Sequence, residues 1–124
     1  LLICEVIKYN ANDAPFKQAA FAQYKYPNAK AKYGQVADEL NLGGKNDDEK
    51  VALLIKAIEQ LKADINIPPS IKDYGIKEED FLAKVDELAQ LAFDDQCTGS
   101  NPAYPRIADL KEIYLKAYYG PKGK

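Results

Sequence analysis

The sequence lacks histidine, tryptophan and methionine, and it holds only two cysteines among 124 residues. Histidine is the most common metal ligand and the usual acid or base near neutral pH. A Ser–His or Cys–His nucleophile pair is therefore excluded within this chain. Cys4 and Cys97 lie far apart, and two cysteines cannot fill a tetrahedral zinc site alone. We expect two reduced thiols and no disulfide framework.

The sequence also lacks a large net charge and long apolar runs. Its formal net charge of −2 at pH 7 supplies no positive field that would attract nucleic acid or an acidic membrane. No apolar run approaches the roughly 18 residues that span a bilayer. A signal peptide would have a basic segment before the apolar run and a cleavage signal after it. The opening Leu1-Leu2-Ile3 has neither. We expect a cytoplasmic protein that contacts neither nucleic acid nor membrane.

Apolar residues recur at helical spacing, which predicts an all-α fold of about five helices. We expect a truncated helix over 1–10, an irregular connector over 11–27 and a helical bundle over 28–124, with helices near 28–42, 47–66, 78–94 and 105–119. The predicted inner faces of these four helices are, in order, Ala29, Tyr33, Val36, Ala37 and Leu40; Val51, Leu54, Ile55, Ile58, Leu61 and Ile65; Phe81, Leu82, Val85, Leu88, Ala89 and Ala92; and Ile107, Leu110, Ile113, Tyr114 and Ala117.

Local signals predict where helices begin and end. Glycine at Gly43-Gly44 permits the left-handed conformation that terminates a helix, and Pro68-Pro69 disfavours helix in the residue before it. Asn46 with Glu49 three residues later resembles a capping box. Residues 70–76 predict a short turn, and Pro105 suits the first turn of the last helix. That helix is predicted to end at Gly120-Pro121.

The first helix has an apolar stripe but no capping residue before it. Leu2, Ile3, Val6 and Ile7 form that stripe, which predicts that an upstream part of the helix is missing. Large exposed apolar patches mark interfaces. We therefore expect the apolar side chains of the first helix and the connector to contact another polypeptide segment: Leu2, Ile3, Val6, Phe16 and Phe21.

Carboxylates are the remaining candidates for chemistry. Asp47-Asp48-Glu49 and Glu78-Glu79-Asp80 sit at predicted helix starts, where the helix dipole favours negative charge, so we interpret both groups as structural. Asp94-Asp95 leads into the loop of Cys97, where a structural and a functional role both stay open. Tyrosines without a basic patch around them indicate packing rather than base stacking.

The stretch AFDDQCTGSNPAYPRIADLKEIYLKAYYG resembles the C-terminal signature of the iron-dependent alcohol dehydrogenases. It most resembles the alcohol dehydrogenase module of bifunctional aldehyde–alcohol dehydrogenases. LLICEVIKYNAND, FAQYKYPNAKAKYGQVADELNL and IPPSIKDYGIKEEDFLAKVDELA match in order and spacing, so the resemblance covers essentially the whole chain. One departure is Ala103 after Pro102, where many single-function members have arginine; the role of Arg106, the nearest arginine, stays open.

The resemblance implies the C-terminal helical domain of a dehydroquinate synthase-like fold. It implies that an upstream α/β domain of the same polypeptide binds NAD, and that iron (or zinc) is held by an aspartate and three histidines that precede Leu1. The parent enzyme would reduce acetaldehyde to ethanol and assemble as a homo-oligomer or filament. No residue of this chain would be catalytic, cofactor-binding or metal-binding, and the chain would be inactive alone.

The resemblance gives this chain one wall of the active-site cleft. Cys97 and Thr98 would line the alcohol pocket, where a small, polarizable side chain leaves room for a short substrate. A buried structural thiol without substrate contact is the alternative for Cys97. For the whole chain, the alternative is a free-standing helical interaction module without catalysis.

Overall fold

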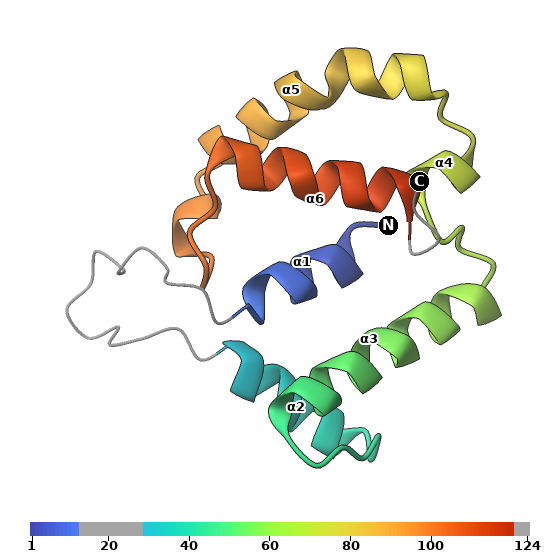
Figure 1. Cartoon of the computed structure of the whole chain (residues 1–124), viewed down its shortest axis with the longest axis vertical. Coiled ribbons are helices and arrows are strands. Elements are labelled where there is room, and N and C mark those ends of the chain that lie inside the picture. Colours follow the sequence, from blue (N-terminus) through green and yellow to red (C-terminus); the bar gives the residue numbers. More distant parts are fainter. Residues whose placement is uncertain (13–28, 121–124) are drawn as a thin grey trace.

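The computed structural model describes residues 1–12 and 29–120. Its elements in chain order are α1 (Ile3–Asn10), α2 (Ala29–Glu39), α3 (Asp47–Asp64), α4 (Ile71–Tyr74), α5 (Glu78–Asp94), the 3-10 helix η1 (Thr98–Ser100) and α6 (Ile107–Tyr119). The described residues contain no strand, which confirms the all-α prediction (Figure 1). Most of the predicted connector over 11–27, with Phe16 and Phe21, lies outside the described residues.

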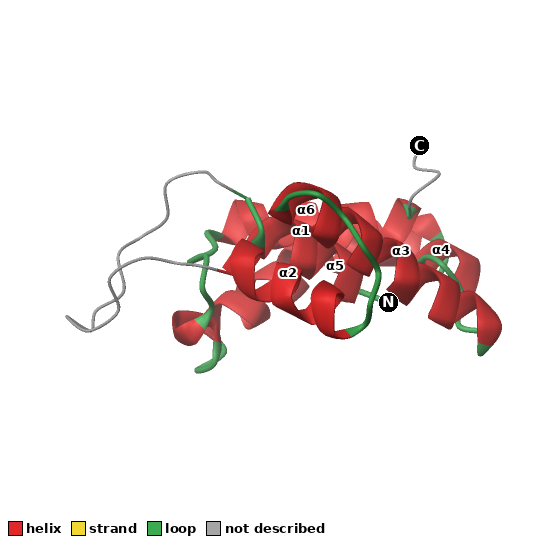
Figure 2. Ribbon diagram, turned by 90° about the horizontal axis from the view of Figure 1, so that it is seen from below, coloured by secondary structure: helices red, strands yellow, loops and turns green. Residues whose placement is uncertain are grey.

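Two helix pairs are joined by the first helix. α2 packs on α3, and α5 packs on α6, while α1 contacts both α3 and α6 from its place between them (Figure 1). Seen from below, the helices form a slab that is thinner than it is broad (Figure 2). The short helix α4 lies against α6. None of the described helices is long and apolar enough to cross a membrane.

The slab has two hydrophobic clusters. Cys4, Ile7 and Ala11 of the α1 segment pack with Val51 and Ile55 of α3. Burying side chains of this size stabilises the fold by about 1.5–3 kcal/mol each, apart from the smaller alanine and cysteine.

The second cluster joins α5 to α6. Phe81, Val85 and Tyr118 form its buried part, and the rings of Phe81 and Tyr118 stack with centroids 4.2 Å apart. The Tyr118 hydroxyl donates to the Ile76 carbonyl oxygen over 2.9 Å, which satisfies the polar end of a side chain that is 1% exposed. Such a ring pair adds about 0.5–1.5 kcal/mol beyond area burial.

Asparagine, rather than glycine or proline, ends α2 and α3. Asn41 and Asn66 adopt left-handed φ values of 55° and 59°. At the first end, the N–H of Asn41 donates to Asp38 and that of Leu42 to Ala37; at the second, the N–H of Asn66 donates to Ala63 and that of Ile67 to Lys62. This paired pattern is the Schellman motif. The prediction that Gly43-Gly44 and Pro68-Pro69 end these helices is wrong in position, since both pairs follow the turn.

Helix starts differ from the predictions in detail. The N–H of Glu49 donates to Asn46 Oδ1 over 2.9 Å, as expected for the cap, but the Glu49 carboxylate accepts from the N–H of Lys45 instead of that of Asn46. The predicted turn over 70–76 contains α4, whose first turn is capped by Ser70 Oγ. Pro105 lies one residue before the N-cap Arg106, so it precedes the first turn of α6. Both acidic triplets occupy first turns, as predicted.

Several predicted inner faces are broader than the faces that are buried. The predicted residues that lie at least 38% exposed are Val36, Leu40, Leu61, Ile65, Leu82 and Ile107, together with Ile3 of α1. Within the described slab, a neighbouring helix covers only part of each apolar stripe. Periodicity located the right side of each helix but overestimated its width. It missed Cys4 and Tyr118, which are both buried.

Gly120 ends α6 and touches α4. Its φ of 73° and ψ of −174° fall in a region that is essentially restricted to glycine. A Cβ atom here would lie 2.7 Å from the Cβ of Ser70, which is fully buried. The predicted stop at Gly120 is therefore confirmed, and the residue has a second role in letting two segments approach closely.

We expect Gly120→Ala to lower the free energy of unfolding by about 2–4 kcal/mol, because backbone strain and overpacking add. Gly99→Ala is the matched control, since a Cβ at Gly99 meets nothing within 4 Å. That control should change stability by less than about 0.5 kcal/mol. Denaturant unfolding of both variants measures this, and equal losses in the two would contradict the account.

Candidate functional site

The segment between α5 and α6 carries Cys97 and Thr98, the two residues that the sequence nominates for a pocket. The N–H of Cys97 donates to Asp95 Oδ1 over 2.7 Å, and Ser100 Oγ donates to the Cys97 carbonyl oxygen over 2.8 Å. The Thr98 hydroxyl donates to the Ala92 carbonyl oxygen of α5. These short-range bonds shape a compact turn (residues 95–100, called the Cys97 turn below) against the end of α5.

The two cysteines occupy different surroundings. Both are free thiols, as predicted; Cys4 is buried and Cys97 is exposed. Burial is the main reason why the pKa of the Cys4 thiol is raised. In the described residues the side chain of Cys97 is open to a substrate or to another part of a longer protein.

Asn101 ties this segment to α1. Its Nδ2 lies 2.7 Å from Asn10 Oδ1 and also donates to the Ala103 carbonyl oxygen. Asn10 is 6% exposed, and its own Nδ2 donates to the Tyr33 hydroxyl of α2 over 3.3 Å. The side chain of Asn10 therefore connects α1, α2 and the segment after the Cys97 turn.

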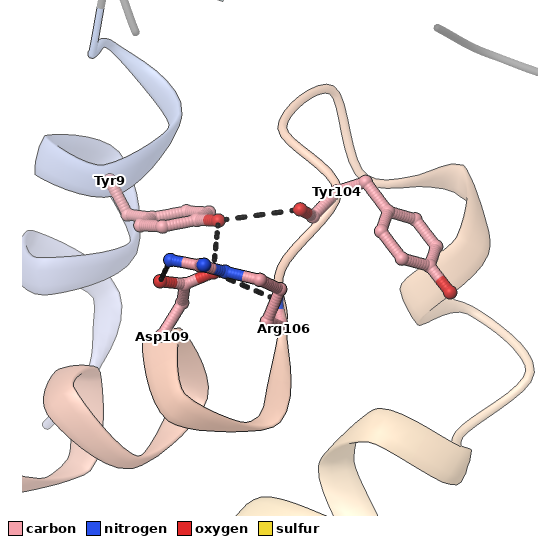
Figure 3. Close-up of polar contacts among 4 residues, drawn as sticks. All are labelled: Tyr9, Tyr104, Arg106 and Asp109. Carbon is pink, nitrogen blue, oxygen red and sulfur yellow. Dashed lines mark hydrogen bonds and ion pairs between the residues drawn. The ribbon is translucent and has the colours of Figure 1, made fainter. Parts of the chain in front are cut away.

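A second polar group fixes the start of α6 (Figure 3). The Tyr9 hydroxyl of α1 lies 3.4 Å from Asp109 Oδ2 and 3.5 Å from the Tyr104 carbonyl oxygen, toward both of which it points. Arg106 donates to Asp109 through its backbone N–H (2.8 Å), Nε (3.1 Å) and a terminal nitrogen (3.1 Å). Arg106 thus forms a bidentate ion pair with Asp109, which caps the first turn of α6.

The charges in this group reinforce its hydrogen bonds. Burial, followed by the charge and hydrogen bond of Asp109, raises the pKa of Tyr9 from 10.0 to about 12. The hydrogen bond from Arg106 is the main cause that lowers the pKa of Asp109. At neutral pH the phenol is therefore a donor and the carboxylate an acceptor.

Two cavities flank α1. A cleft of about 800 Å³ between α1 and α6 is lined in part by Glu5, Tyr9, Asp109 and Tyr119. A smaller one of about 190 Å³ is lined in part by the buried Cys4. Cys97 and Thr98 line neither cavity. Among residues 1–12 and 29–120, no group of three or more His, Cys, Asp or Glu side chains could hold a metal ion.

The family resemblance pointed to Cys97 and Thr98, but it did not identify the residues that hold their turn in place. Tyr9, Asn10, Asn101 and Asp109 carry the long-range contacts. One signal was present. Asn10 follows Ile7 by three residues, so it lies on the inner face of α1, where a polar residue must find a partner.

Known proteins are similar to this chain in sequence over most of its length. The Fe-containing alcohol dehydrogenase family, C-terminal part, matches residues 1–118. The bifunctional aldehyde-alcohol dehydrogenase AdhE of Escherichia coli (strain K12) is 53% identical over 122 residues, which cover 97% of this chain and 14% of that protein. An aldehyde-alcohol dehydrogenase of Clostridium acetobutylicum is 52% identical over 118 residues, covering 95% of this chain and 14% of that protein.

A shorter relative shows the same likeness. The NADPH-dependent butanol dehydrogenase of Clostridium saccharobutylicum is 37% identical over 89 residues, covering 72% of this chain and 23% of that protein. The chain thus spans about a seventh of the length of the two aldehyde-alcohol dehydrogenases named above, since 14% of each is covered.

We expect the phenol of Tyr9 to titrate near pH 12, because burial and the charge of Asp109 raise its pKa. The stabilising contribution of this raised pKa is complete below about pH 10 and is lost as the pH rises through about 12. The near-ultraviolet absorbance titration of the protein minus that of Tyr9→Phe isolates this phenol.

Asp109→Asn is the matched control for that titration. It should move the pKa of Tyr9 part of the way back toward 10.0, because the charge is removed while burial, the larger cause, remains. A Tyr9 pKa near 10 in the unsubstituted protein would contradict the described contact.

Proposed function

Because this chain belongs to the Fe-containing alcohol dehydrogenase family, we propose that residues 1–124 form the C-terminal helical domain of an NAD-dependent, iron-containing alcohol dehydrogenase. The enzyme interconverts acetaldehyde and ethanol within a bifunctional aldehyde–alcohol dehydrogenase. The observation that carries this proposal is the 53% identity over 97% of the chain with a protein of that name. Since only 14% of that protein is covered, the proposal places the remaining parts of the enzyme upstream. The same coverage counts against a free-standing interaction module.

The proposal assigns the metal and the nicotinamide to the upstream part. The sequence contains no histidine, and the described residues offer no group of ligands for iron. These residues do not fit the metal. Their part is to shape and support the alcohol-binding side of the cleft.

The Cys97 turn supplies that wall in our proposal. Cys97 is exposed on a turn that is held on α5 through Thr98 and on α1 through Asn101. A rigid turn with a small exposed side chain suits a pocket for a short alcohol, because pocket residues act by shape when packing fixes them. Hydride transfer needs no protein nucleophile, so the thiol does not have to react.

The face around α1 is where we place the contact with the upstream domain. Leu1 and Ile3 are exposed, and Leu2 and Val6 are only partly buried. Exposed apolar side chains of this size favour an interface. The contribution of Phe16 and Phe21 stays a prediction, as do a homo-oligomeric or filamentous assembly and a cytoplasmic location.

Replacing Cys97 by leucine in the full-length enzyme should raise KM for longer alcohols more than KM for ethanol. We expect a shift of about tenfold in their ratio, because one or two methylene groups in a tight pocket are worth that much. Gln96→Leu is the matched control, since Gln96 is an exposed neighbour in the same turn. An unchanged ranking of alcohols in Cys97→Leu would count against the pocket role.

The purified 124-residue chain should reduce no acetaldehyde with NADH. The physical reason is that the proposal places both the metal ligands and the cofactor site outside it. A steady-state assay at high chain concentration checks this, with the full-length enzyme as the positive control and mass spectrometry to verify the chain. Measurable turnover by the chain would refute the assignment.

A further inference from the structure

Asn10 stands out among the buried polar side chains because it connects separate segments. The buried polar or charged residues in the described ranges are Asn10, Lys62 and Ser70. Ser70 caps its own short helix, and Lys62 donates to the nearby Pro69 carbonyl oxygen over 3.4 Å. Asn10, in contrast, meets partners 23 and 91 residues away in sequence, in Tyr33 and Asn101.

The bond to Asn101 sets where the Cys97 turn lies relative to α1. The other bonds described for this turn are local: they join it to itself or to the end of α5. Two hydrogen bonds are described between α1 and the segment that follows the turn. The one from Asn101 to Asn10 is 2.7 Å long, and the one from Tyr9 to the Tyr104 carbonyl oxygen is 3.5 Å long. The shorter bond is also the nearer to Cys97 in sequence.

Because Asn10 is buried, breaking its hydrogen bond with Asn101 is costly in free energy. Asn10 lies at the end of the α1 face that also buries Cys4 and Ile7. Since an unpaired amide in such surroundings is costly, the segment is held where Asn101 can donate to it. A position of the Cys97 turn that breaks this bond leaves Asn10 Oδ1 without the donor described for it.

We propose that Asn10 is a positioning residue for the Cys97 turn: through Asn101 it fixes the distance of Cys97 and Thr98 from α1. Its consequence for alcohol binding rests on the pocket role proposed above. Asn10 touches no reacting group in this account. It acts by holding the turn in one place, so that the pocket keeps one shape.

The test uses the full-length enzyme with Asn10→Ala, Asn101→Ala and the double variant. Tyr33→Phe is the matched control, because it removes the other partner of Asn10 and leaves the bond to Asn101 intact. The first measurement is hydrogen exchange of the backbone amides at 96–101. The second is KM and kcat for ethanol and for a longer primary alcohol.

We expect amide exchange at 96–101 to rise about three- to tenfold in each single alanine variant, the range of a net buried hydrogen bond. The effect of the double variant should be smaller than the two single effects combined, since both substitutions remove the same contact between Asn10 and Asn101. This comparison also separates the contact from the Asn101 bond to Ala103. Tyr33→Phe should leave exchange in the turn within about twofold. KM for the longer alcohol should change more than kcat.

Unchanged exchange in Asn101→Ala, or an equal rise in Tyr33→Phe, would overturn the inference; Asn101 is only partly buried, so this variant remains informative if Asn10→Ala fails to fold. Additive effects in the double variant would overturn it too. Raised exchange with an unchanged ranking of alcohols, in these variants and in Cys97→Leu, would support the positioning role and refute the pocket role.

Discussion

The packing of α1 between α3 and α6 is the contact on which the described arrangement depends. α2 packs on α3 and α5 packs on α6, and α1 contacts one helix of each pair. The apolar part of this contact is the burial of Cys4, Ile7 and Ala11 against α3. Its polar part runs from Tyr9 and Asn10 to the segment around α6. One eight-residue helix thus makes apolar contacts with α3 and polar contacts with the segment around α6.

The helices could be predicted from the sequence because each has a clear apolar period and a recognisable end. Within residues 1–12 and 29–120, all five helices of eight residues or more were located. The errors lie where two signals compete. In Leu40-Asn41-Leu42 and Ile65-Asn66-Ile67, the apolar residues extend the helical period past an asparagine that adopts left-handed φ. Periodicity counts such apolar residues as helix, whereas the short amide side chain tolerates the turn.

The candidate site was only half predictable, for a different physical reason. The Cys97 turn could be nominated because its residues are adjacent in sequence and resemble a family signature. Its anchors could not, because Asn10 and Asn101 are 91 residues apart and Tyr9 and Asp109 are 100 residues apart. Nothing local encodes such a pairing. A polar residue on an apolar face indicates that a hydrogen-bond partner exists, but only the three-dimensional structure shows which residue that partner is.

The wide separation of these pairs bears on how the protein is made. Ribosomes synthesise α1 before α6, so the groups of α1 that pair with Asn101 and Asp109 have to wait for partners that lie 91 and 100 residues further along. The α2–α3 pair can form early, because its contacts lie close together in sequence, whereas long loops must close before α1 meets α6. During that interval the apolar side of α1 can already pack on α3, whereas the partners of Tyr9 and Asn10 in the Asn101–Asp109 segment are still missing. Formation of the contact between α1 and α6 is thereby delayed until α6 has been synthesised.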